Sequence, residues 1–206
     1  MYEIAERPTP LSKVHEEFGM SPARDPHNDF VGQLYFQLRV LLGNSSLMVK
    51  IDTFRYLDDW LINSFGDFKN VMNLDRFTNG LKRFGASMAF IQSKLREYAG
   101  AGTIPPGYAP DVFITSTETR SDQFAIPLAV FEVVSQYSRE HDFHFKPFFY
   151  ETIGVREYFI CESKGETGVI SRAYRLQENE YAPIPLEQGN YASEIVGQPL
   201  PRIWTF

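Results

Sequence analysis

A single glutamate, Glu132, interrupts the apolar run Leu128–Val134. The run is short, rich in β-branched and aromatic residues and preceded by Pro127, which predicts a buried strand. Taking one carboxylate out of water costs several kcal/mol, so a buried acid usually has an ionic partner, a raised pKa or a metal. A second acid, Asp111, stands at the start of another predicted strand. This pair of acids is the first candidate for chemistry.

Three polar residues follow Glu132 at helical spacing. Asp142, Lys146 and Tyr150 are each four residues apart, so they share one face of a predicted helix. If that face packs over the strand ends, Lys146 reaches towards the two acids. Carboxylates hold Mg²⁺, which prefers oxygen ligands, and a lysine stabilises the extra charge on a reacting phosphate. The set therefore predicts metal-assisted hydrolysis of a phosphodiester.

With these residues the chain resembles the Uma-two family of endonucleases, within the PD-(D/E)XK nuclease superfamily. The matching residues are Pro110-Asp111-Val112, Glu132-Val133-Val134-Ser135, Asp142, Lys146, Tyr150, Gly154-Val155 and Glu157-Tyr158. The first-helix pattern of the family is similar to His27, Val31, Leu34 and Leu38. The resemblance covers residues 104–200 well, residues 27–43 weakly and residues 57–103 hardly at all.

The resemblance implies a restriction-endonuclease-like α/β fold, with a central mixed β-sheet flanked by helices, and DNA as the partner. It implies Asp111 and Glu132 as ligands of Mg²⁺ or Mn²⁺, with the backbone carbonyl of Val133 as a further ligand. Lys146 corresponds to the catalytic lysine, which the superfamily carries where this chain has Val134. The supporting residues are Tyr150, Asp142, Ser135 and His27.

The chain departs from the family pattern at several positions. Gln136-Tyr137 stands where the family often has Pro-Ser, and Cys161-Glu162 stands where it often has an aspartate. The acid that many relatives carry before the first helix has no clear counterpart. Pro147 directly follows Lys146, and a proline is tolerated in a helix only near the first turn.

Each candidate residue also has a structural interpretation. Glu132 could pair with a lysine or arginine for structure alone, but Asp111 and Lys146 at matching spacing favour a site. Asp142 is interpreted as a helix N-cap. Tyr150 is interpreted as a packed tyrosine that donates a hydrogen bond into the site.

The histidines allow fewer conclusions. His141 and His144 resemble a metal pair, but zinc needs at least a third protein ligand and none is obvious nearby. His27 could line the site or simply begin the first helix, and both interpretations stay open.

Composition excludes several classes of protein. The chain has 206 residues, of which 43% are hydrophobic and 15% aromatic, so we expect a folded core and not a disordered chain. A net charge of −6 argues against a general DNA-coating protein. The one cysteine, Cys161, allows no internal disulfide and favours the cytoplasm. We expect no membrane span and no signal peptide.

The hydrophobic pattern predicts alternating helices and strands. Predicted helices cover residues 28–42, 74–98 and 142–153, the last ended by Gly154. Predicted strands cover residues 47–54, 111–115, 128–134 and 157–161, followed by a hairpin of 169–176 and 181–186. We expect a flexible N-terminal arm at residues 1–26, one nuclease-like domain at 27–206 and a helical insertion at 57–103.

The predicted helix at 74–98 has an unbroken 3-4 apolar spacing. This pattern could form the seam of a homodimer, or it could pack on its own domain. We favour packing on the domain, because the pattern is short and contains Gly80 and Gly85.

The resulting hypothesis is a metal-dependent endonuclease that cleaves DNA with Asp111, Glu132 and Lys146. The alternative is a catalytically silent member of the fold that binds nucleic acid or protein. The negative net charge and the missing upstream acid favour the alternative.

Overall fold

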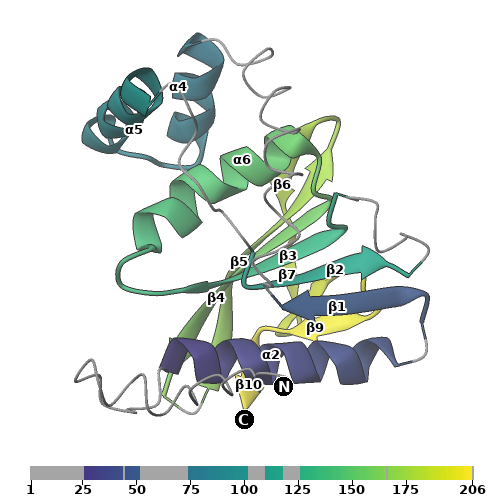
Figure 1. Cartoon of the computed structure of the whole chain (residues 1–206). Coiled ribbons are helices and arrows are strands. Elements are labelled where there is room, and N and C mark those ends of the chain that lie inside the picture. The colour runs from purple at the N-terminus through teal and green to yellow at the C-terminus, as the bar shows by residue number, and fades with distance from the viewer. Residues whose placement is uncertain are drawn as a thin grey trace, which may run out of the picture.

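A seven-stranded mixed sheet runs through the middle of the protein (Figure 1). The computed structural model describes residues 26–43, 45–51, 74–101, 110–117, 126–165 and 167–205, and all statements here concern these residues. The strand order is β1-β2-β3-β4-β5-β10, with β6 also paired to β5. The strands are β1 (Leu47–Ile51), β2 (Val112–Ser116), β3 (Ala129–Val134), β4 (Glu157–Lys164), β5 (Thr167–Gln177), β6 (Glu180–Pro183) and β10 (Ile203–Thr205).

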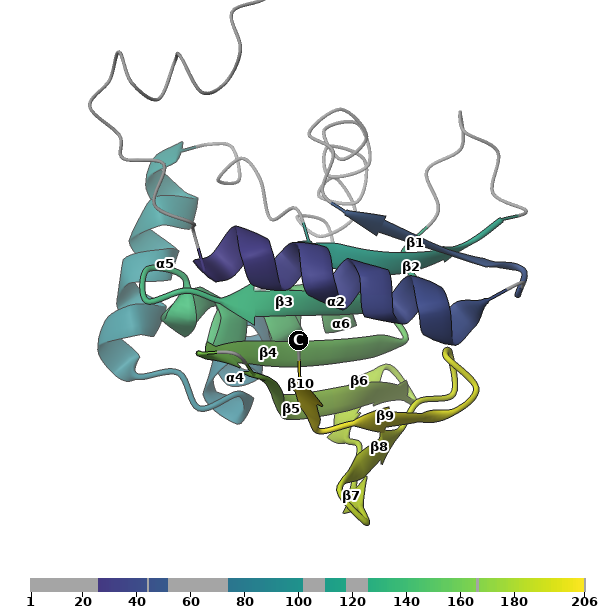
Figure 2. The same cartoon turned by 90° about the horizontal axis from the view of Figure 1, so that it is seen from below.

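Helices cover both faces of this sheet (Figures 1 and 2). On one face lies α2 (Pro26–Leu42), which packs into a cluster with Val112, Phe131 and Val133. The cluster on the other face contains the elements η1 (His141–Phe145), α6 (Lys146–Ile153), α4 (Leu74–Arg83) and α5 (Met88–Ala101). The chain therefore has the predicted fold class, a central mixed sheet flanked by helices.

β3 and β4 are the parallel pair of the sheet, and the other paired strands are antiparallel. Parallel neighbours need a crossover connection, which η1 and α6 supply here. Because both faces of β3 are covered, its residues from Ala129 to Val133 are at most 1% exposed. This explains why the strand is one continuous apolar run broken only by Glu132.

The expectation of one helix over residues 74–98 is wrong. α4 ends at Arg83 and α5 begins at Met88, and Gly85 between them has a φ of +82°. A left-handed residue cannot continue an α-helix, and glycine adopts that conformation without a Cβ clash. Leu81 and Ile91 are buried in the domain's own core, as the packed interpretation expects, whereas Met88 of the same series is 52% exposed.

Most other predicted elements are confirmed within a few residues. α2, β1, β2, β3 and β4 stand where the pattern placed them, and β5 and β6 form the predicted hairpin. Gly154 caps α6 with a φ of +88°. Residues 1–25, 52–54 and 57–73 of the predicted arm, first strand and insertion lie outside the described residues.

Several short C-terminal strands were not predicted. Besides β10, they are β7 (Leu186–Glu187), β8 (Asn190–Ala192) and β9 (Pro199–Pro201), which form a second, three-stranded sheet. They are too short for an alternating pattern, and prolines stand at both ends of β9. In the described part of the chain, none of the helices is both long and apolar enough to cross a membrane.

Candidate functional site

Glu132 stands in the middle of β3 with no exposed surface. The Nζ of Lys146 donates to its Oε2 over 2.8 Å, and the hydroxyl of Tyr150 donates to its Oε1 over 2.8 Å. Burial raises the pKa of Glu132 to about 8, against the opposing charge of Lys146 and with a contribution from Asp111. Both oxygens have a donor inside the fold, which makes the burial tolerable.

Lys146 is the first residue of α6, and its amine lies between two acids. Its Nζ is 2.8 Å from Glu132 Oε2 and 2.7 Å from Asp142 Oδ1, and its side chain is 12% exposed. Burial opposes the positive charge, but the two carboxylates hold the pKa of Lys146 above its usual value. The prediction that Asp142, Lys146 and Tyr150 share one helix face turned to Glu132 is confirmed as a geometry.

A π-helical turn before α6 explains how Pro147 is accommodated next to Lys146. The turn, η1, runs directly into α6, and Pro147 lies in the first turn of α6, where a proline is tolerated. Single π-turns are found frequently at functional sites. Lys146 therefore keeps its position at the helix start although a proline follows it.

The interpretation of Asp142 as a helix N-cap is wrong. Its backbone N–H donates to the carbonyl of Ser138 over 2.8 Å, as in a helix interior, because the helical segment already begins at Arg139. Its side chain is buried, with Oδ2 accepting from the Ser138 hydroxyl and Oδ1 paired with Lys146. The sequence reasoning missed Ser138, although its spacing of four residues from Asp142 was a usable signal.

Asp111 lies just before β2, beside Glu132. The last pair of the β2–β3 register is Val112 with Phe131, so one further step sets Asp111 opposite Glu132. Its Oδ2 accepts from the N–H of Val133 over 2.7 Å. Burial alone would raise the pKa of Asp111, but the hydrogen bond from His27 and the charge of Lys146 lower it.

His27 lies in the first turn of α2 and contacts the residues beside Glu132, so its position agrees with both open interpretations. Its Nε2 is 2.9 Å from the carbonyl oxygen of Val133 and 3.4 Å from Asp111 Oδ2. The hydrogen bond to Asp111 raises the pKa of His27 to about 9, although burial of the ring opposes the rise. Figure 2 shows the start of α2 beside the end of β3, which brings these groups together.

The remaining predicted residues lie further from Glu132. Ser135 exchanges hydrogen bonds with Ser138 in the turn after β3 and reaches the acids only through it. His144 Nδ1 is 2.7 Å from the carbonyl of Phe84, and the His141 ring lies edge-on to Phe90. The two histidines thus help to join η1 to the helices α4 and α5.

Two of the oxygens that the resemblance assigns to a metal converge on one cationic group. Asp111 Oδ2 and the Val133 carbonyl both lie within 3.4 Å of His27 Nε2. Two carboxylates and one carbonyl suit a hard divalent cation, and Mg²⁺ commonly keeps several waters beside one or two carboxylates. No group of three or more His, Cys, Asp and Glu side chains among the described residues is arranged to hold a metal. A cation held by Asp111, Glu132 and the Val133 carbonyl would therefore need further ligands from solvent or substrate.

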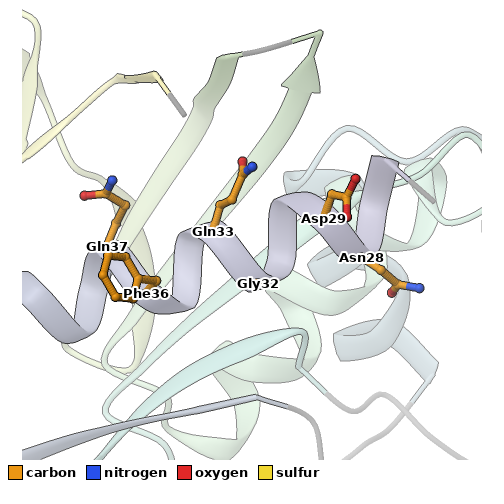
Figure 3. A pocket seen from close by; sticks show the side chains of 6 residues that line it. All are labelled: Asn28, Asp29, Gly32, Gln33, Phe36 and Gln37. Atoms are coloured by element: carbon orange, nitrogen blue, oxygen red, sulfur yellow. The ribbon is translucent and has the colours of Figure 1, made fainter. Parts of the chain in front are cut away.

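A separate hollow of about 450 Å³ lies on the outer side of α2 (Figure 3). Its lining residues are Asn28, Asp29, Gly32, Gln33, Phe36 and Gln37. None of the residues around Glu132 lines it, so it does not mark the buried site.

Comparison with known families gives one match. Residues 88–200, just over half of the chain, match the model of the Uma2 family, described as "Putative restriction endonuclease". The matched segment begins at α5 and contains Asp111, Glu132 and Lys146. Comparison with curated proteins gives no match.

Proposed function

Because the chain belongs to the Uma2 family of restriction-endonuclease-like proteins, we propose that it is a metal-dependent nuclease that hydrolyses DNA phosphodiester bonds. The main support is the contact of 2.8 Å between Lys146 Nζ and Glu132 Oε2, at a depth where Glu132 is fully buried. Cleavage of cellular DNA would be a cytoplasmic activity, which agrees with the buried free thiol of Cys161.

In this proposal Asp111, Glu132 and the Val133 carbonyl hold Mg²⁺ or Mn²⁺. The bound ion supplies Lewis-acid stabilisation of the phosphate and a more acidic water. His27 and the Val133 N–H keep the carboxylate of Asp111 oriented and ionised. A cation that binds the Val133 carbonyl and Asp111 Oδ2 would have to displace His27 from them.

Lys146 has the role of the catalytic lysine. Its raised pKa keeps it protonated at neutral pH, so it can donate to a phosphate oxygen as negative charge develops there. Asp142 also contacts the amine, and Tyr150 fixes the orientation of the Glu132 carboxyl group.

Plasmid cleavage tests the proposal. We expect nicking by the wild type with Mg²⁺ or Mn²⁺ and none with EDTA. Asp111→Asn, Glu132→Gln and Lys146→Gln should each lower the rate by about 10²–10³-fold, as expected for loss of one charged group that stabilises a transition state. Equal cleavage by the wild type and all three variants would show that the site is assigned wrongly.

Glu157→Gln is the matched control. Glu157 is also a buried acid of the sheet, 1% exposed, but Arg175 and Ser193 hold it away from Lys146. A folded Glu157→Gln protein should cleave like the wild type, so a general loss of stability can be separated from a loss of chemistry.

One observation favours the silent alternative. In the described structure Glu132 already has a donor at each oxygen, and Asp111 Oδ2 already accepts from Val133 and lies beside His27. A network satisfied in this way can be purely structural. Calorimetric titration with Mg²⁺ or Mn²⁺ separates the two: no heat of binding at millimolar metal, with the fold intact, favours a module without catalysis.

A further inference from the structure

An exposed aromatic side chain stands just beyond the strand that carries Glu132. Tyr137 lies in the turn after β3 and is 89% exposed. Single exposed aromatics are common on protein surfaces, so the argument depends on what surrounds Tyr137.

The turn that carries Tyr137 is held by hydrogen bonds on both sides of it. The N–H of Ser135 donates to Ser138 Oγ and the N–H of Ser138 donates to Ser135 Oγ, each over 3.1 Å. The hydroxyl of Ser138 continues the network to Asp142, which pairs with Lys146. The turn thus has a defined position relative to the proposed catalytic lysine.

Two arginines flank the same region. The guanidinium groups of Arg139 and Arg172 lie 4.7 and 4.8 Å from the centre of the Phe143 ring. Arg139 is 59% exposed and pairs with Glu162 at 2.6 Å. Arg172 is exposed, and no carboxylate among the described residues pairs with it. A contact with a ring fixes the position of a guanidinium group, and its N–H groups can then bind a phosphate: those of Arg172 directly, and those of Arg139 beside its ion pair with Glu162.

The sheet register links Arg172 to the proposed centre. Glu132 pairs with Ile160 on β4, and Ile160 pairs with Arg172 on β5, so the three side chains form one row on the same face. Two strand spacings separate the first and last backbone positions, about 10 Å. The register then skips Ser171, a β-bulge of the kind that redirects side chains near active sites.

We propose that Tyr137, Arg139 and Arg172 form a binding rim for an unpaired nucleotide next to the phosphate cleaved at Glu132 and Lys146. The arginines bind phosphate oxygens of the neighbouring nucleotides, and the Tyr137 ring stacks on the base. An exposed ring stacks on a free base face, which a paired duplex does not offer, so the rim selects single-stranded or locally opened DNA. The inference rests on the proposed function for the position of the cleaved bond.

Binding of a labelled single-stranded oligonucleotide, followed by fluorescence anisotropy in EDTA, tests the rim without cleavage. Tyr137→Ala should weaken single-strand binding roughly 5–100-fold, whereas Tyr137→Phe, which keeps the ring, should bind like the wild type. Arg172→Gln should lower the slope of log K against log salt concentration by about 0.7, the value for one lost phosphate contact on a single strand.

Two surface variants serve as matched controls. Phe36 is an exposed aromatic residue on α2, 64% exposed, so Phe36→Ala removes a ring of similar size away from the rim. Arg39 stacks on the Tyr35 ring, so Arg39→Gln makes the same charge change as Arg172→Gln in a similar local setting. Phe36→Ala should leave the affinity for the single strand unchanged. Arg39→Gln should weaken binding only by the small amount that loss of one positive charge anywhere on the protein causes, and Arg172→Gln should weaken it further.

The rim is overturned if Tyr137→Ala and Phe36→Ala bind the single strand equally, or if the wild type does not bind it at all. Equal losses on the matching duplex would overturn the choice of an unpaired nucleotide. If the wild type cleaves DNA and Tyr137→Ala binds the single strand as well as the wild type does, the rim proposal is wrong and the nuclease proposal stands. If single-strand binding depends on Tyr137 but the wild type shows no metal-dependent cleavage, the nuclease proposal is wrong and the rim proposal stands.

Discussion

At the scale of single residues, the site has three acidic and two basic groups in contact. Glu132 and Asp142 contact the amine of Lys146, and Asp111 lies beside His27. Burial raises the pKa of Glu132 to about 8, so this carboxyl group is mostly protonated at neutral pH in the metal-free protein. A divalent cation bound beside Glu132 would favour its ionised form.

His27 should make the stability of the metal-free protein depend on pH. Its pKa is raised to about 9 by Asp111, so its contribution is fully present below about 6.5 and is lost as the pH rises through about 9. We expect His27→Gln to lower the free energy of unfolding by on the order of 1–2 kcal/mol at pH 6 and by much less at pH 10.

Urea denaturation across this pH range measures the effect of His27. His144→Gln is the control, because His144 also contacts a backbone carbonyl but has no acid partner among its described contacts. A wild-type minus His27→Gln difference that stays constant from pH 6 to pH 10 would show that the charge on His27 does not stabilise the fold.

Tyr150 should stabilise the protein mainly through its hydroxyl group. It donates to an oxygen of the fully buried Glu132, and leaving a buried acceptor without its donor costs about 1–3 kcal/mol. Tyr150→Phe should cost that much in thermal or urea unfolding. Tyr174→Phe, a tyrosine that packs by its ring against Tyr181, should change stability by less than about 0.5 kcal/mol. Equal costs for the two variants would contradict this account.

At the scale of elements, the site depends on the junction between η1 and α6. The π-turn and the first turn of α6 bring Asp142 and Lys146 to β3, and α4 and α5 pack on the outside of this segment. Gly80 on α4 lies so close to α6 that a Cβ atom there would be 2.2 Å from the Phe148 ring. α4 and α5 therefore support the helix that carries the lysine.

Two helical glycines should respond to the same substitution with opposite signs. Gly80→Ala forces Phe148 to move and should cost about 1–3 kcal/mol of stability. Gly32 on α2 has open space around it, so Gly32→Ala should stabilise the protein by up to about 1 kcal/mol through helix propensity. Urea denaturation of both variants checks the contrast, and stabilisation by Gly80→Ala would mean that α4 does not press on α6.

At the scale of the whole molecule, the C-terminal segment closes the core. Leu200 and Trp204 are buried in the cluster under α2. The acid Glu157 ties the segment to β4, since it accepts from the Ser193 hydroxyl, from the N–H of Glu194 and from Arg175. Glu157 is thus a second buried acid of the sheet, with a structural set of partners.

Ser193→Ala should loosen this closure. It leaves a buried carboxylate oxygen without its hydroxyl donor, so we expect a loss of about 1–3 kcal/mol and a fall in Tm of about 2–8 °C. Hydrogen exchange should be faster at the amides of Val196 and Gly197, which bond to Ser193. Ser93→Ala, on the exposed side of α5, should change neither quantity. If hydrogen exchange at these amides is unchanged in Ser193→Ala, Ser193 does not hold the C-terminal segment against β4.

Sequence by itself determined the strands β2 to β4, the helix α2 and the candidate residues Asp111, Glu132 and Lys146. These follow from local information: an apolar run marks a doubly covered strand, and residues four apart share a helix face. The family resemblance supplied the roles, which stay predictions until cleavage is measured.

Tertiary structure decided what local patterns could not. The 3-4 spacing continues through Gly85, so only the backbone conformation there divides α4 from α5. Asp142 is a good N-cap residue by type, but its place inside η1 depends on a helix start set by Ser138 and Arg139. The contact of His27 with Val133 joins residues far apart in sequence, so its distance is fixed only when α2 packs against the sheet. The lone glutamate in an apolar run thus predicted a buried charge, while its partners were decided by packing.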